Sequence, residues 1–311
     1  MAEPPERSAM TGSPGERLRL AWRRSDRLRG YALLAPTLLV MLALLGLPLV
    51  ALLVVSFWRQ EYVSLDTSFT LGNYATVFDF ARSPIYLTLL GRSLVMAACA
   101  TTAVILLAFP IAYFLAFRVG RRKLVWIILI TLPFWTSYLL RIFAWKVILG
   151  FNGLINSGLI SIGLVAKPLE FLLYNPTAVT ITLAHAWAAY AILPIYVSLD
   201  KIDRSVLEAA TDLGDGPVRR FCRVTLPLAA PGTIAAALLV FIPTVGDYVT
   251  PALVGGTTGV MVGNIIQALF GRMNDAPLGA ALSVVMMLTV TLLVSAVLWR
   301  GRRRRLIAPG I

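Results

Sequence analysis

Asp200-Lys-Ile-Asp-Arg-Ser-Val-Leu-Glu-Ala-Ala-Thr-Asp-Leu-Gly-Asp-Gly-Pro-Val-Arg-Arg-Phe-Cys-Arg223 is a polar stretch between two strongly apolar segments, and it continues directly into Val224-Thr-Leu-Pro227. Five of its residues recur at the spacing of one helical face, so we predict a short helix with an apolar stripe. Two glycines end this helix, and Pro217 begins the next one. An apolar stripe on a polar loop lies either on the lipid surface or in a groove of another protein. The stripe consists of Ile202, Val206, Leu207, Ala210 and Leu213, and the glycines are Gly214 and Gly216.

The composition places the chain among the polytopic membrane proteins. Its 311 residues are 58% hydrophobic and 14% charged, with a mean hydropathy of +0.80, whereas soluble domains are about 25% charged. A net charge of +13 would suggest nucleic acid in a soluble protein. In a membrane protein it indicates arginines that set the topology, so we expect no nucleic-acid partner. Cys99, Cys222 and the single histidine, His185, have no metal-binding spacing, and we expect no metal site.

Six apolar segments are long enough to cross a bilayer, for which a helix needs about 20 residues. We therefore predict an all-α fold with six transmembrane helices. The first helix falls within residues 29–60, after a basic and disordered tail over residues 1–28, and a second basic tail covers residues 301–311. The predicted spans are 31–58, 86–117, 124–149, 177–199, 228–253 and 279–299.

The distribution of basic residues predicts that both the N and the C terminus are cytoplasmic. Three quarters of the 28 lysines and arginines lie in residues 1–30, 118–123, 200–223 and 300–311. The acidic residues are less biased, as expected where lysine and arginine alone set the orientation. With this topology the polar stretch that follows the fourth span lies in the cytoplasm.

The cytoplasmic stretch also carries a spaced motif. Glu208-Ala209-Ala210, three residues, Gly214, nine residues and then Val224-Thr-Leu-Pro227 resembles the EAA loop of permease subunits of bacterial ABC importers, which usually have isoleucine in place of Val224. The resemblance implies a type-I ABC importer permease fold, with a core over residues 86–300 and a coupling loop over 200–227. We expect Glu208 to accept hydrogen bonds near the helix start and Gly214 to allow a sharp turn. The candidate coupling residues are Glu208, Ala209, Ala210, Gly214, Leu226 and Pro227, the last two directing the fifth span into the membrane.

A second resemblance narrows the class of solute. Leu132-Pro-Phe-Trp-Thr-Ser-Tyr-Leu-Leu-Arg141 and Gly246-Asp247-Tyr248 resemble the spermidine/putrescine-type permeases, although Ala252 stands where those relatives commonly have an acidic residue. The resemblance implies a small cationic solute such as a polyamine. The alternatives are another solute for the same machinery, such as an amino-acid derivative, an opine or a metal chelate, or an ion-coupled secondary carrier.

The resemblance also implies the partners. These are a cytoplasmic ABC ATPase dimer, a second homologous permease that forms a heterodimer with this chain, and an external solute-binding protein, assembled in the lipid of the bacterial inner membrane. The sequence has no Gly-x-x-x-x-Gly-Lys-Ser/Thr phosphate-binding loop. We therefore expect no catalytic residue and no cofactor on this chain, with ATP and Mg bound by the partner ATPase.

Ionisable residues within spans are costly and indicate function. Arg141 and Asp247 both fall in the outer part of their predicted spans. Asp247 is a candidate to receive a cationic solute, and an Arg141–Asp247 salt bridge that locks an outer gate is the alternative. Aromatic ring faces attract ammonium groups. The further candidates for the solute pathway are Trp135, Tyr138, Tyr190 and Tyr248.

Overall fold

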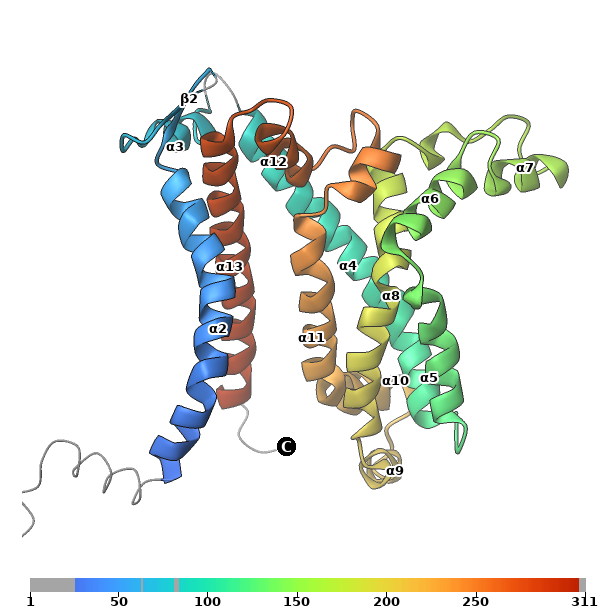
Figure 1. Ribbon diagram of the computed structural model, residues 1–311. Coiled ribbons are helices and arrows are strands. Elements are labelled where there is room, and N and C mark those ends of the chain that lie inside the picture. The colour runs from blue at the N-terminus through green and yellow to red at the C-terminus, as the bar shows by residue number, and fades with distance from the viewer. Residues whose placement is uncertain (1–25, 63, 81–83, 308–311) are drawn as a thin grey trace, which may run out of the picture. The chain divides into compact units, whose positions relative to one another are not determined.

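The computed structural model describes residues 26–62, 64–80 and 84–307, which are mostly helical (Figure 1). The chain divides into two compact units, Met1–Val55 and Ser56–Ile311. In the first unit the described residues form helix α2 (Asp26–Val55), which contains Pro36 and Pro48. Its apolar part has a mean hydropathy of 3.0 over a length sufficient to cross a bilayer. Residues 1–25 of the predicted basic tail lie outside the described residues.

The second unit begins with a small antiparallel hairpin that the sequence did not predict. Its strands are β1 (Arg59–Glu61) and β2 (Ser64–Asp66), and in the strand register Arg59 lies opposite Asp66. The short helix α3 (Gly72–Val77) follows. The Asn73 amide donates to the backbone oxygens of Ser56 and Trp58, at 2.9 and 2.7 Å. These bonds attach α3 to the residues that directly precede β1.

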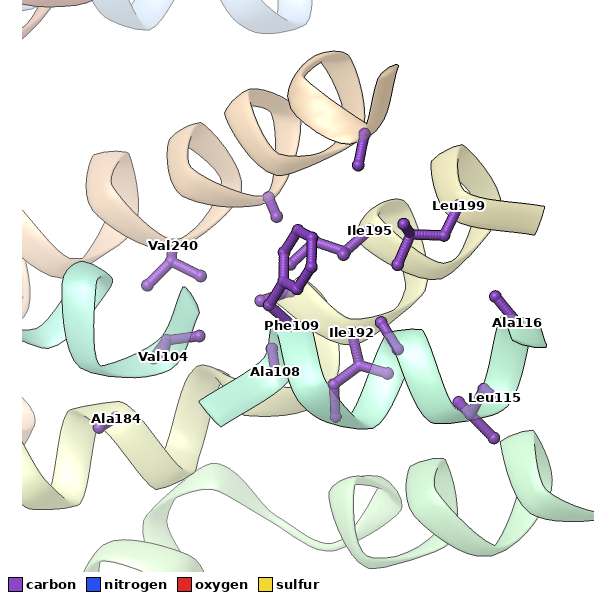
Figure 2. Close-up of a cluster of buried hydrophobic side chains, with 14 of the residues drawn as sticks. Val104, Ala108, Phe109, Leu115, Ala116, Ala184, Ile192, Ile195, Leu199 and Val240 are labelled. Carbon is purple, nitrogen blue, oxygen red and sulfur yellow. The ribbon is translucent and has the colours of Figure 1, made fainter. Parts of the chain in front are cut away.

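The core of the second unit consists of α4 (Ile85–Phe117), α8 (Pro176–Asp200) and α11 (Leu226–Val245), which pack side by side (Figure 1). Many of the side chains at their interface are alanines, and small residues let helix backbones approach closely within a membrane. Figure 2 shows the ring of Phe109 among the three helices. The buried cluster contains Val104, Ala108, Phe109, Ala112, Leu115, Ala116, Ala184, Ala191, Ile192, Ile195, Leu199, Ala229, Ala236 and Val240.

The closest approach of α8 and α11 lies at Gly232. A Cβ atom at this position would lie 2.4 Å from the carbonyl oxygen of Pro194 and 2.4 Å from Cβ of Ser198. No side chain fits there, so the backbones of the two helices are in direct contact. The chain between them forms α9 (Arg204–Asp212), α10 (Pro217–Arg220) and the π-helical turn η4 (Phe221–Thr225).

The third predicted span is not one continuous helix, and that prediction was wrong. The segment divides into α5 (Lys123–Thr131), the 3₁₀ turn η2 (Leu132–Trp135), and α6 (Tyr138–Leu149). Pro133 lacks a backbone N–H and disfavours a regular helix before it. Thr136 and Ser137 then take extended backbone, with ψ of 156° and 135°. After α6 come α7 (Leu154–Ser161) and η3 (Glu170–Leu172).

The fifth predicted span ends earlier than expected, at Val245 rather than at residue 253. The helix stops because Asp247 caps a new one, whose π-helical turn η5 (Pro251–Gly255) follows. The remaining helices are α12 (Val262–Phe270) and α13 (Ala276–Ile307). Helix α13 continues through residues 301–307, which were predicted as part of a tail, and residues 308–311 lie outside the described residues.

Six helical segments within the described residues are long and apolar enough to cross a membrane. This number confirms the predicted six-span, all-α fold. The third of them is Tyr138–Ser161, preceded by the shorter apolar stretch Lys123–Trp135. Helices α9 and α12 lie at opposite ends of the α8–α11 pair (Figure 1).

The contact at Gly232 predicts a specific sensitivity of the core. Gly232→Ala should lower the stability of the protein in detergent by about 1–3 kcal/mol, because the added methyl group collides with the backbone of α8. The measurement is the thermal midpoint of the purified protein. Gly91→Ala on α4 is the matched control, since a Cβ there meets nothing within 4 Å. Equal midpoints for the two variants would contradict the direct backbone contact.

Candidate functional site

Helix α9 begins at a capped end. The Asp203 carboxylate accepts the backbone N–H of Ser205 at 3.0 Å, and this bond lowers the pKa of Asp203. A side-chain acceptor at this position satisfies one of the free N–H groups of the first turn. Glu208 was expected to accept hydrogen bonds near the helix start. It lies instead in the second turn and is exposed, so the capping role belongs to Asp203.

Helix α9 ends in a Schellman turn at Gly214. This residue has φ of +85°, a left-handed conformation that favours glycine. The Asp215 N–H donates to the Ala210 carbonyl at 3.0 Å, and the Gly214 N–H donates to the Thr211 carbonyl at 2.9 Å. The sharp turn expected at Gly214 is therefore present, and its part in coupling remains a prediction.

The residues of the apolar stripe of α9 differ in how far they are exposed. Ala210 is 8% exposed, and Ile202, just before the helix, packs against the main core. Val206 is 44% exposed and Leu213 is 88% exposed. The first pair holds α9 on its own chain, and the second pair leaves apolar surface for another molecule.

The arginines after α9 contact the turn itself. The Asp215 carboxylate forms ion pairs with Arg219, at 3.8 Å from Nε, and with Arg223, at 3.5 Å from Nη1. Arg220 donates from Nη1 to the Thr211 hydroxyl at 2.8 Å. These are exposed contacts, and each contributes little to stability. Together they hold the segment after Gly214 close to the end of α9.

The fifth span was predicted to begin at residue 228, but Leu226 and Pro227 already lie inside a longer helix, and their part in directing it stays a prediction. The helix begins at Pro217 and is continuous through η4 into α11. Pro227 cannot donate to the carbonyl four residues earlier. The π turn accommodates this gap, with the Leu226 N–H bonded to the carbonyl of Phe221. The direction of α11 is therefore set within a continuous helix.

A cavity of about 320 Å³ lies between α6, α8 and the end of α11. It brings together five of the six predicted pathway residues, which come from α6, from α8 and from the residues that follow α11. Trp135 is the exception, because it lies at the end of η2, is 84% exposed and does not line the cavity. The lining residues are Tyr138, Arg141, Ala186, Trp187, Tyr190, Pro243, Gly246, Asp247 and Tyr248.

The Asp247 carboxylate is held by uncharged donors. Its Oδ1 accepts the backbone N–H groups of Val249 at 2.9 Å and Thr250 at 3.4 Å. Its Oδ2 accepts the Tyr138 hydroxyl and the Thr250 hydroxyl, both at 2.6 Å. The same side chain therefore caps the helix that follows and binds α6 to it.

Arg141 does not pair with this carboxylate. Its Nη1 donates to the carbonyl oxygen of Ala186 at 3.0 Å, and its Nε is buried without a partner. The guanidinium carbon lies 5.3 Å from the centre of the Phe134 ring and 5.8 Å from that of Tyr138. Within the described part of the chain, no carboxylate forms an ion pair with Arg141. The expected alternative of an Arg141–Asp247 salt bridge is absent from this conformation.

An open apolar groove of about 900 Å³ runs along α8 and α11 from the cavity toward α9. Tyr190 lines both the cavity and the groove. Lys201 and Asp203 line its far end, beside the start of α9. The groove wall between them is mostly apolar and includes Leu193, Pro194, Val197, Val206, Leu228, Pro231, Ala235 and Leu239.

Sequence reasoning missed three residues that build these sites. Thr250 binds the Asp247 carboxylate and is fully buried. Asp203 caps α9, and the backbone of Ala186 holds Arg141. A helix-start pattern marks both Asp247 and Asp203, since each aspartate precedes a helix by one or two residues. No sequence signal marks Ala186, because every residue has a backbone carbonyl and the residue type does not reveal which one accepts a hydrogen bond.

These features define a multi-pass membrane protein with a cavity between its helices that is lined by Arg141 and Asp247. Residues 20–306 match the family described as binding-protein-dependent transport system inner membrane component. The chain belongs to this family. It is a membrane permease subunit of an ABC importer and has no catalytic role of its own. It is a multi-pass protein of the bacterial inner membrane.

Curated relatives carry names within the same class. The chain is 35% identical to the spermidine/putrescine transport system permease protein PotB of Escherichia coli (strain K12), covering 83% of this chain and 92% of the relative. It is 34% identical to PotB of Haemophilus influenzae (strain ATCC 51907 / DSM 11121 / KW20 / Rd), covering 80% and 85%. A crystal structure of a bacterial ABC transporter that imports the acidic polysaccharide alginate contains a similar chain. The TM-score is 0.69 at 16% identity, with 93% of this chain and 98% of the other covered. This likeness shows a shared fold.

The double role of Asp247 predicts a difference between two substitutions. Asp247→Ala removes the cap and the acceptor of two hydroxyl groups, and it should destabilise the protein by about 1–2 kcal/mol. Asp247→Asn keeps a side-chain oxygen that can cap the helix, so its loss of stability should be clearly smaller than that of the alanine variant. Thermal midpoints in detergent measure both. Identical midpoints for the alanine variant and the unsubstituted protein would contradict the capping geometry.

Proposed function

We propose that this chain forms half of the translocation pathway for a small cationic solute such as a polyamine. The supporting observation is the Asp247 carboxylate, which lines a cavity and has only uncharged donors as partners. A carboxylate without a counter-ion attracts an ammonium group strongly in a medium of low dielectric constant. Tyr138, Trp187 and Tyr190 add aromatic rings to the same wall. The names of the PotB relatives point to the same class of solute.

A solute that carries an anionic group beside its amine is the second candidate. Arg141 lines the same cavity as Asp247 and has no carboxylate partner there. An amino-acid derivative or an opine satisfies both charges. A metal chelate matches the charges of Arg141 and Asp247 less directly. An ion-coupled secondary carrier does not agree with the family to which the chain belongs.

The groove along α8 and α11 supports a second permease as a partner. This groove is open along its length and is lined mainly by apolar side chains, of which Tyr190 is 49% exposed. We propose that a homologous permease packs on this face as a heterodimer. The two chains then enclose a pathway from the Asp247 cavity to the end of the groove beside α9. An external solute-binding protein delivers the solute at the Asp247 side.

The exposed part of α9 supports a docking site for a cytoplasmic ABC ATPase dimer, which binds ATP and Mg. Val206 and Leu213 offer apolar surface, and Glu208 is exposed on the same short helix. An amphipathic helix of this kind fits a groove of a partner protein. Because α9 lies between α8 and α11, closure of the ATPases moves both walls of the groove. A conformational change follows only where ATP binds one state more tightly than the other.

The proposed solute is tested on the complete importer reconstituted in proteoliposomes with its ATPase, second permease and binding protein. Uptake of radiolabelled putrescine or spermidine should occur, and Asp247→Asn should reduce it at least about tenfold, because a charge-assisted hydrogen bond to the ammonium is lost. Asp275→Asn on the same chain is the control for a carboxylate outside the cavity. Uptake of a zwitterionic amino acid, with no uptake of either amine, would favour the second candidate. Uptake that is unchanged in Asp247→Asn would contradict the role of this carboxylate.

The turn at Gly214 tests the coupling role of α9. Gly214→Val forces a branched side chain into a left-handed conformation at a cost of about 1–2 kcal/mol. We expect normal insertion of the chain but a several-fold loss of solute-stimulated ATP hydrolysis. Gly216→Ala is the matched control, because Gly216 has φ of −66° and open space around it. Full stimulation in the Gly214 variant would remove the coupling proposal.

A further inference from the structure

The cavity that contains Asp247 holds two opposite charges that do not neutralise each other. Arg141 and Asp247 both line its wall. The carboxylate is bonded to hydroxyl and backbone N–H groups, and the guanidinium is bonded to the backbone oxygen of Ala186. Unlike charges that line one cavity attract each other and ordinarily pair. Their separation therefore requires a structural cause.

Tyr138 provides this cause. Its hydroxyl donates to Oδ2 of Asp247 at 2.6 Å, while its ring lies 5.8 Å from the guanidinium carbon of Arg141. The tyrosine side chain thus lies between the two charged groups and contacts each with a different part. Phe134 offers a second ring to the guanidinium at 5.3 Å. Contacts with aromatic faces stabilise an arginine without neutralising it.

The position of the guanidinium has a consequence for a bound cation. An ammonium group that reaches Asp247 lies in the same cavity of about 320 Å³ as a fixed positive charge. The attraction of the carboxylate outweighs this repulsion for one ammonium that is in direct contact with it. A second ammonium on the same molecule has no carboxylate of its own among the lining residues, because Asp247 is the only acidic residue there. It is repelled by Arg141 and by the first ammonium, which already neutralises the charge of Asp247.

We propose that Arg141 is a specificity-determining residue, which admits one ammonium group to Asp247 and disfavours a second positive charge in the same cavity. The inference rests on the proposed function, in that Asp247 must receive a cation. It assigns Arg141 a role in selecting among cationic solutes by the number and spacing of their charges. A diamine then enters with one end at Asp247 and its other charge held outside the cavity.

The test measures binding to the permease–ATPase complex in nanodiscs without the external binding protein, so that the receptor does not decide which solute arrives. The probes are butylammonium and 1,4-diaminobutane, which have the same chain length and differ by one charge. Calorimetry or quenching of tryptophan fluorescence gives the dissociation constants, since Trp187 lines the cavity. Arg141→Gln should shift the ratio of the two constants toward the diamine by roughly tenfold, the scale of one charge–charge interaction at the effective dielectric constant of a protein.

Three variants complete the experiment. Arg141→Lys keeps the charge and should keep the ratio of the unsubstituted protein. Lys146→Gln removes a positive charge from the same helix outside the cavity, and it should leave the ratio unchanged. Arg141→Met keeps packing against the rings of Phe134 and Tyr138, and it replaces the glutamine variant if that variant does not assemble.

The outcomes separate this inference from the proposed function. Binding of both probes that is lost in Asp247→Asn supports the cationic site. If that loss occurs and Arg141→Gln leaves the ratio unchanged, the role of Arg141 is overturned while the proposed function stands. If Arg141→Gln raises the affinity for both probes equally, the specificity role of Arg141 is also overturned. Such a result indicates that Arg141 only competes with the ammonium group for the Asp247 carboxylate. If neither probe binds and Asp247→Asn changes nothing, the proposed function itself fails.

Discussion

The direct contact between the backbones of α8 and α11 at Gly232 is the constraint on which the other features depend. Both helices connect to the segment that contains α9, and both line the groove and the Asp247 cavity. Because no side chain separates them at Gly232, they cannot slide apart without losing buried area along the alanine-rich core. A force on α9 therefore acts on the two helices as a pair.

The two ends of this pair differ in their hydrogen bonding. Near α9, the chain is held within a short segment by the Asp203 cap, the Schellman turn at Gly214 and the ion pairs of Asp215. At the other end, α11 stops at Val245 and a new helix starts under the control of Asp247. The break places backbone and carboxylate at a cavity, which is where a membrane protein tolerates irregular structure.

Much of the architecture was predictable from local properties of the chain. Apolar length indicated six spans, and the spacing of Glu208, Gly214 and Pro227 located the segment between the fourth and fifth of them. Five of the six candidate pathway residues, Tyr138, Arg141, Tyr190, Asp247 and Tyr248, line one cavity, and their part in transport stays a prediction. The continuous third span and the long fifth span were wrong. Hydropathy averages over a window and does not register where proline or a capping aspartate stops a helix.

The sequence by itself determined the class, the number of spans and the identity of the charged residues, because bilayer thickness and residue type act locally. Only the tertiary structure decided which charges meet. Arg141 and Asp247 lie 106 positions apart in the chain, and their side-chain partners depend on how α6, α8 and α11 pack. Tyr138 lies between them and Trp135 points elsewhere, although both belong to one short motif. The extended residues after η2 reorient the chain at that point, and a reorientation of this kind depends on packing that residue spacing does not encode.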